Sequence, residues 1–247
     1  MNAKADCLSG KTAIVTGATS GIGAALATQL VARDVTVFGV GRNEARLADF
    51  GRQLGKRFIP VRADLSDEGD RARAVETLLA SGLAIDILVN NAAECAYGTF
   101  LSMPLAHVRR LFEVNLFACL ELAHELAPGL TRGSHILNVS SVTARFVPNP
   151  RFAPYALTKL ALEEATRALR LELSPRGIKV SAIAFGLVDT PIYDRVEGFA
   201  ETREKLDASV AQWLSADDAA HAIVWVVSQP PHVVVADLEL LPLGQSR

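Results

Sequence analysis

Short apolar runs alternate along the chain with longer stretches in which apolar residues recur every three or four positions. Short runs rich in Val, Ile and Leu are typical of strands buried on both faces, and the longer periodic stretches are typical of amphipathic helices. The predicted strands are Thr12–Thr16, Val35–Val40, Arg57–Arg62, Ile85–Asn90, Ser134–Ser140, Lys179–Ile183 and Asp237–Leu241. The predicted helices are Gly23–Arg33, Glu44–Leu54, Glu68–Ser81, Pro104–Leu126, Tyr155–Leu173 and Ser215–Ser228.

This alternation of buried strands and helices predicts an α/β fold with a doubly wound parallel sheet and helices on both faces. No linker is visible, so the chain is treated as one domain over residues 1–247. In such folds ligands bind at the carboxyl ends of the strands, where the strand order reverses. Residues that follow a predicted strand are therefore the first candidates for function.

Composition excludes several other classes of protein. Of 247 residues, 50% are hydrophobic and 21% are charged, as in ordinary globular proteins. The net charge of −2 offers no basic stripe for nucleic acid, and no apolar run is long enough to predict a membrane span. The ten N-terminal residues have no apolar core, so no signal peptide is expected. Three scattered cysteines and isolated histidines predict a reducing, cytoplasmic location and no metal site.

A glycine-rich turn, TGATSGIG over residues 16–23, follows the first predicted strand. Between a strand and a helix, such a turn lets the backbone approach a pyrophosphate. The helix N-terminus then presents free N–H groups and the positive end of its dipole. This context is the one that dinucleotide binding requires. The glycines are spaced GxxxGxG, which differs from the usual GxGxxG.

Further motifs follow the later strands. They are RADLSD around Asp64, NNAA at 90–93, FEVNLF around Asn115, a serine pair at 140–141, YALTK at 155–159 and GLVDT at 186–190. With the glycine motif, they resemble the short-chain dehydrogenase/reductase family, in its single-domain branch of roughly 250 residues. The chain departs from the family pattern at Ala93, which replaces a glycine, and at Phe185, which replaces a proline.

The resemblance implies a Rossmann-like fold and a set of residues that bind a nicotinamide dinucleotide. In the family, Asp64 corresponds to a residue that contacts the adenine, and Lys159 to one that also bonds the nicotinamide ribose. The implied cofactor-binding residues are Gly17, Thr19, Ser20, Gly21, Ile22, Gly23, Arg42, Asp64, Leu65, Asn91, Ala92, Tyr155, Lys159, Gly186, Val188 and Thr190.

Tyr155 and Lys159 are four residues apart on one predicted helix, so they share a face. A free tyrosine has a pKa of about 10, and we expect the nearby ammonium to lower the pKa of Tyr155. The phenol could then protonate a carbonyl oxygen, or deprotonate an alcohol in the reverse direction. A serine hydroxyl would hold the same oxygen against the hydride donor.

Two serines end the fifth predicted strand, and their side chains alternate in direction. Ser141 lies fourteen residues before Tyr155 and Ser140 fifteen. The usual spacing in the family is one residue shorter than that of Ser141, so we favour Ser141 with a one-residue insertion in the following loop. Asn115 resembles the helical asparagine of the family, whose backbone holds a water linking the lysine to solvent. A packing role for Asn115 is the alternative.

The end of the second strand favours NADP(H) over NAD(H). NAD-dependent folds place an acid about twenty residues after the glycines, where it bonds the ribose 2′-hydroxyl. Here Gly41 occupies the position at which the NAD enzymes of the family carry Asp, and Arg42 follows. A guanidinium can pair with the 2′-phosphate of NADP(H). An adenine-stacking role without cofactor selection is the alternative for Arg42.

A substrate lid is expected at about 189–213, by its position in the family. We expect a largely apolar pocket, because the lid and two nearby segments are rich in apolar residues. The residues are Ile192, Tyr193, Val196 and Phe199 of the lid, Phe185, and Val142, Phe146 and Val147 of the loop after Ser141. Arg145 could meet an anionic substrate or be an exposed loop residue. The expected substrate is a small to medium ketone, aldehyde or secondary alcohol.

The leading hypothesis is therefore an NADP(H)-dependent oxidoreductase with Tyr155 as general acid and base. A non-catalytic NADP-sensing regulator or scaffold protein on the same fold is the alternative, although such proteins typically lose the Tyr or the Lys. Apolar residues lie on more than one side of the helices Pro104–Leu126 and Tyr155–Leu173. They predict a second buried face and hence a homodimer or homotetramer.

Overall fold

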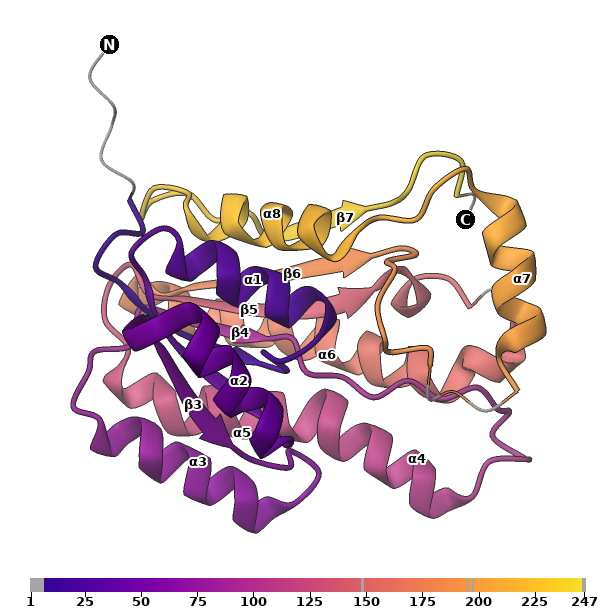
Figure 1. Ribbon diagram of the computed structural model, residues 1–247, viewed down its shortest axis with the longest axis horizontal. Helices are drawn as coiled ribbons and strands as arrows, with labels where there is room; N and C mark the ends of the chain where they lie inside the picture. Colours follow the sequence, from indigo (N-terminus) through magenta and orange to yellow (C-terminus); the bar gives the residue numbers. More distant parts are fainter. Residues whose placement is uncertain (1–6, 148, 195, 197, 246–247) are drawn as a thin grey trace.

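A parallel sheet of seven strands forms the centre of the protein (Figure 1). The structure is a computed structural model that describes residues 7–147, 149–194, 196 and 198–245. The strand order is β3-β2-β1-β4-β5-β6-β7, so the chain reverses its direction of travel between β1 and β4. The strands are β1 (Thr12–Thr16), β2 (Thr36–Gly41), β3 (Phe58–Arg62), β4 (Ile87–Asn90), β5 (His135–Ser141), β6 (Lys179–Phe185) and β7 (Asp237–Leu240).

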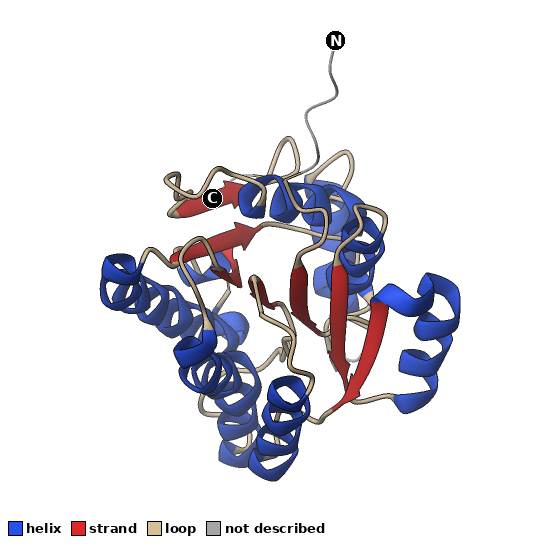
Figure 2. Cartoon of the chain, turned by 90° about the vertical axis from the view of Figure 1, so that its left-hand side faces the viewer, coloured by secondary structure: helices blue, strands red, loops and turns tan. Residues whose placement is uncertain are grey.

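Helices cover both faces of the sheet (Figures 1 and 2). One face packs against α1 (Gly21–Val31), α2 (Glu44–Leu54) and α8 (Ala216–Val227). The other packs against α3 (Glu68–Ala80), α5 (Ala118–Leu126) and α6 (Ala153–Leu173), and α4 (Leu105–Phe112) packs against α6. Helix α7 (Ala200–Ser209) lies beyond the carboxyl ends of β6 and β7 (Figure 1). Short 3-10 turns occupy Gly55–Arg57, Ala127–Gly129, Val142–Ala144, Pro150–Phe152 and Ser174–Arg176.

Burial along the strands explains why they read as apolar runs. Every residue of β1, β4 and β6 is buried, because helices cover both sides of these inner strands. The edge strands β3 and β7 are partly exposed. Strand β3 contains Pro60, which lacks an N–H group and therefore fits best at a sheet edge. The predicted α/β class with a doubly wound parallel sheet is confirmed.

The long helix predicted over Pro104–Leu126 is interrupted in the structure. A π-helical turn, Glu113–Phe117, separates α4 from α5. Helix α7 was not predicted, because none of its residues is buried and its sequence has no apolar stripe to reveal a helix. It lies inside the expected lid, in which positions 195 and 197 are outside the described residues. That residues 1–247 form one domain stays a prediction.

The described part of the chain contains neither a candidate membrane span nor a candidate metal-binding cluster. No helix there is long and apolar enough to cross a membrane. No group of three or more His, Cys, Asp or Glu side chains in the same part is placed to hold a metal ion.

Candidate active site

The glycine-rich turn after β1 brings backbone close to the ends of two other strands. Gly17 and Gly21 have φ values of +69° and +50°, a region that favours glycine. A Cβ at Gly17 would lie 3.0 Å from the Cα of Ala92, and one at Gly21 would lie 3.1 Å from the Cβ of Thr190. The turn therefore leaves a cradle at the start of α1 that suits a pyrophosphate.

Gly23, the last glycine of the motif, packs closely against the turn itself. A Cβ at this position would lie 2.2 Å from the carbonyl oxygen of Gly17 and 2.6 Å from Nδ2 of Asn91. Gly23 does not line the cavity described below. The absence of a side chain lets α1 pack closely against the turn. That Gly23 also binds the cofactor stays a prediction.

Thr16, the last residue of β1, joins the glycine turn to the end of β4. Its Oγ1 accepts hydrogen bonds from the backbone N–H groups of Asn91 and Ala92, each at 2.9 Å. Nδ2 of Asn91 donates to the Thr16 carbonyl at 2.8 Å. Thr16 is not among the site residues expected from the sequence. Its position directly before the first glycine of the motif was the available signal.

A cavity of about 910 Å³ lies at the carboxyl ends of the strands, around the point where the strand order reverses. Two of the predicted site residues, Gly23 and Asn115, do not line it. The structure brings the others together in its walls: Gly17, Thr19, Ser20, Gly21, Ile22, Arg42, Asp64, Leu65, Asn91, Ala92, Ser141, Tyr155, Lys159, Gly186, Val188 and Thr190.

One end of this cavity, here called the Arg42 end, is bordered by Arg42, Arg46 and Asp64. Burial alone would raise the pKa of Asp64. Hydrogen bonds from the backbone and hydroxyl of Ser66, together with the charges of Arg110 and Arg42, outweigh burial and lower that pKa. Arg46, which follows Arg42 by four residues in the first turn of α2, is not among the residues expected from the sequence.

Tyr155 and Lys159 lie in the cavity wall on α6, and Ser141 lies at the end of β5. Both α6 side chains are buried. Nζ of Lys159 is 5.9 Å from the centroid of the Tyr155 ring and donates to the Val139 carbonyl at 2.9 Å. The Ser141 hydroxyl lies close enough to the Tyr155 phenol to oppose the rise of its pKa. The three side chains thus surround one point at which a carbonyl oxygen could bind.

Burial dominates the electrostatics of this cluster. It raises the pKa of the Tyr155 phenol well above its usual value, and Cys95 and Tyr193 add to the rise while the Ser141 hydroxyl opposes it. Burial also lowers the pKa of Lys159. The expectation that Lys159 lowers the pKa of Tyr155 below its usual value is therefore wrong for this structure. The phenol is protonated near neutral pH, which is the form that can donate to a carbonyl oxygen.

Both serines at the end of β5 border the cavity. Ser141 is the one that reaches Tyr155, and its Oγ also accepts from the backbone N–H of Thr143 at 3.3 Å and from the Thr143 hydroxyl at 2.9 Å. The Ser140 hydroxyl is buried and has no hydrogen-bond partner among the residues that the structure describes. The geometry thus favours Ser141 as the serine beside Tyr155.

Asn115 is fully buried in the π-helical turn between α4 and α5. Its Oδ1 accepts from the backbone N–H of Glu94 at 2.8 Å. Its Nδ2 donates to the Glu94 carbonyl at 2.9 Å and to the Thr158 hydroxyl at 3.0 Å. The side chain therefore connects the loop after β4 to α6. Such π-helical turns are frequent at functional sites.

The lid and the loop after β4 meet in an aromatic cluster beside Tyr155. The rings of Tyr193 and Phe199 stack with centroids 4.9 Å apart, and Tyr97 packs edge-to-face against Phe199 at 5.7 Å. The Tyr97 hydroxyl also bonds Thr202 of α7 at 2.6 Å. Ile192, Tyr193 and Val196 line the cavity, as expected, whereas Phe199 supports them from behind.

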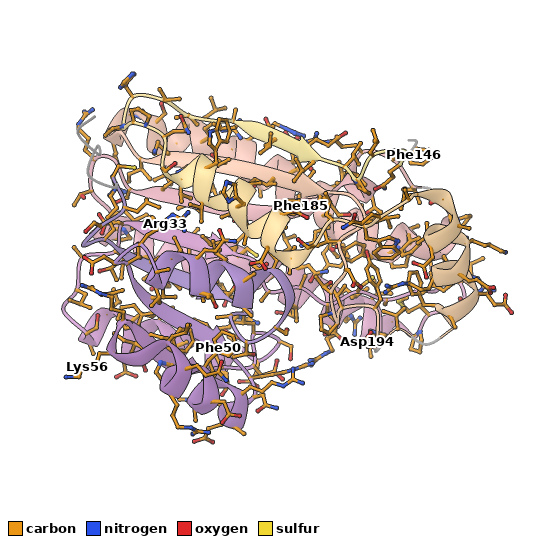
Figure 3. All side chains as sticks on the ribbon, turned by 45° about the horizontal axis from the view of Figure 1, so that its top comes forward. Arg33, Phe50, Lys56, Phe146, Phe185 and Asp194 are labelled. Carbon is orange, nitrogen blue, oxygen red and sulfur yellow. The ribbon has the colours of Figure 1, made fainter. Side chains whose placement is uncertain are left out.

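Contrary to the prediction, the loop after Ser141 does not contribute to the cavity wall. Val142, Phe146 and Val147 are absent from its walls, and Phe146 lies at the periphery while Phe185 lies near the middle of the molecule (Figure 3). Phe185 does line the cavity. Arg145 pairs with Glu163 at 3.2 Å and Glu239 at 2.9 Å, so its charge is balanced within the protein.

Comparison with known proteins agrees with this geometry. Residues 11–199 match the family model described as short chain dehydrogenase. A serine 3-dehydrogenase from Rhizobium radiobacter is 36% identical over 239 residues, which cover 95% of each chain. The solved structure of a serine dehydrogenase in its closed form with NADP⁺ has a TM-score of 0.88 at 26% identity and covers 96% of each chain.

A short chain dehydrogenase from Burkholderia cenocepacia, solved in complex with NADP, is also similar. It is 31% identical, with a TM-score of 0.82, and the match covers 94% of this chain and 97% of that one.

The doubly wound sheet and its switch-point cavity define a dinucleotide-binding oxidoreductase. Its glycine cradle fits the pyrophosphate of such a cofactor. The chain belongs to the short-chain dehydrogenase/reductase family. It is an NAD(P)-dependent enzyme acting on CH–OH or C=O groups, and its similarity to NADP complexes supports NADP binding.

Proposed function

We propose that the protein is an NADP(H)-dependent carbonyl reductase or alcohol dehydrogenase in which Tyr155 transfers the proton. The observation that carries this proposal is the meeting of Ser141, Tyr155 and Lys159 at one end of the cavity. Retention of both Tyr155 and Lys159 argues against a non-catalytic NADP sensor. The cytoplasmic location indicated by the cysteine pattern stays a prediction.

Hydride transfer is the chemistry that a bound nicotinamide supplies. In reduction, Tyr155 donates its phenolic proton to the carbonyl oxygen. In oxidation, the phenol must first lose its proton to solvent before it can accept the proton of the alcohol. Ser141 donates a hydrogen bond to the same oxygen and orients it. Lys159 binds the nicotinamide ribose, and the backbone of Asn115 holds a water that links Lys159 to solvent. The glycine turn from Gly17 holds the pyrophosphate, and Arg42 pairs with the 2′-phosphate.

We propose a small to medium, largely apolar ketone, aldehyde or secondary alcohol as substrate. Ile192, Tyr193, Val196 and Phe185 support this, because they put apolar surface on the cavity wall. The ion pairs of Arg145 also support it, because this cation is already balanced. A 3-hydroxy amino acid is the second candidate, because a relative at 36% identity is named serine 3-dehydrogenase.

A substrate panel separates these candidates. We expect NADPH oxidation with apolar ketones and aldehydes to show a higher kcat/KM than with polyhydroxylated carbonyl compounds of similar size. NADP⁺ reduction with serine and with apolar secondary alcohols extends the panel in the oxidative direction. A higher kcat/KM for serine would establish the second candidate. Higher values for the polyhydroxylated set would show that the apolar interpretation of the pocket is wrong.

We also propose that the enzyme is a homodimer or homotetramer. Phe117, Leu157, Leu160 and Leu171 are 44%, 42%, 45% and 79% exposed on or beside α5 and α6. Covering this apolar surface with a second copy would remove it from water. We expect light scattering at micromolar concentration to give at least twice the 26.4 kDa of one chain. A mass of one chain would contradict the proposal.

A further inference from the structure

Arg110 on α4 joins two loops that border the Arg42 end of the cavity. Its Nε donates to Oε2 of Glu94, on the loop after β4, at 2.8 Å. Its Nη1 donates to Oγ of Ser66, on the loop after β3, at 2.5 Å, and its Nη2 lies 3.8 Å from Oδ1 of Asp64. Arg110, Glu94 and Asp64 all line the cavity. One guanidinium thus spans the gap between the two loops.

The backbone of the same Glu94 is bonded to Asn115, which connects it to the helix that carries Tyr155. The N–H and carbonyl of Glu94 both bond the side chain of Asn115, which also bonds Thr158 on α6. The Thr158 hydroxyl in turn donates to the Tyr155 carbonyl at 2.7 Å. Arg110 is therefore linked to the helix carrying Tyr155 through Glu94 and the buried side chains of Asn115 and Thr158.

We propose that Arg110, through its bond to Glu94, is a positioning residue for the adenosine half of the cofactor. The pair holds the loops after β3 and β4 at a fixed separation, so the wall formed by Asp64, Leu65 and Ala92 is preset before a nucleotide binds. This inference rests on the proposed NADP(H) site. It differs from the part given to Arg42, because the charge of Arg110 is balanced by Glu94 within the protein.

Loss of the pair should weaken binding without slowing the chemical step. Two loops that are no longer joined must be ordered when the nucleotide binds, and that ordering reduces affinity. The proton-transfer cluster of Tyr155, Ser141 and Lys159 keeps its other contacts. The effect should therefore appear in the Kd of the cofactor, and hardly at all in kcat at saturating cofactor.

The experiment measures the Kd of NADPH and of adenosine 2′,5′-bisphosphate for Arg110→Gln, Glu94→Gln and the double variant. Each single variant should bind both probes about five- to tenfold more weakly, and the double variant no more weakly than Arg110→Gln. Arg110→Lys should recover part of the loss. Arg109→Gln is the matched control, because Arg109 is the exposed neighbour on the same helix and lies outside the cavity wall.

Binding of both probes within twofold of wild type by either single variant would overturn the proposal. So would strictly additive losses in the double variant, or an equal loss in Arg109→Gln. Should Arg110→Gln unfold, Glu94→Gln carries the test, since it keeps the size of the side chain. Failure of the wild-type enzyme to bind NADPH would instead count against the proposed function itself.

Discussion

Tyr155→Phe should lower kcat by about 10²- to 10⁴-fold while leaving the Kd of NADPH within twofold of wild type. The substitution keeps the buried ring and removes only the phenolic hydroxyl, which faces Ser141. That hydroxyl is the group able to donate a proton to a substrate oxygen at this point of the cavity. Single-turnover and steady-state kinetics, with cofactor binding measured separately, test the expectation.

Two further variants serve as controls for the loss of kcat expected of Tyr155→Phe. Tyr97→Phe also removes one phenol hydroxyl from the cavity wall, but this hydroxyl bonds Thr202 of α7, so kcat should change only a few-fold. Lys159→Ala should impair both turnover and cofactor binding. Activity of Tyr155→Phe within a few-fold of wild type would remove Tyr155 from the proton-transfer step.

NADPH should be preferred over NADH, and Arg42→Ala should reduce that preference by roughly ten- to a hundredfold. Loss of one charge-assisted pair with the 2′-phosphate costs about 1.5–3 kcal/mol, which corresponds to such a factor. The ratio of kcat/KM for the two cofactors is the measurement. Arg52→Ala is the control, because Arg52 lies on α2, the helix that follows Arg42, but is exposed, pairs with Asp49 and does not line the cavity. Equal discrimination in wild type and Arg42→Ala would refute the part given to Arg42.

The neighbouring Gly41 allows the reverse experiment. A Cβ at Gly41 would approach Oγ1 of Thr19 to 3.5 Å, an ordinary contact distance, so a side chain fits there. Gly41→Asp combined with Arg42→Ala would place a carboxylate where a ribose 2′-hydroxyl can bond it. We expect this double variant to favour NADH over NADPH.

The order of the elements could be predicted because it depends on local patterns. The inner strands are buried on both faces, so their sequences are mainly apolar, and β1 has the bounds that were predicted, Thr12–Thr16. The helices around them show a periodic apolar face. Helix α7 escaped prediction because it buries no residue and so has no such face.

The residues of the site were predictable where the spacing within one motif fixes their relative positions. Tyr155 and Lys159 share a helical face by spacing alone, and the glycine turn must follow a strand. The pKa of Tyr155 was not predictable in this way, because it depends on how deeply the tertiary fold buries the phenol. The same holds for Arg145, whose partners Glu163 and Glu239 come from α6 and β7.

The sequence by itself determined the α/β class and the motifs that identify the family, since these reside in short stretches with fixed spacing. Only the tertiary structure decided which residues meet across the cavity. It showed that Gly23 packs α1 against the turn, and that Asn115 links Glu94 to Thr158. These contacts join segments far apart in the chain, and the packing of helices on the sheet sets their distances.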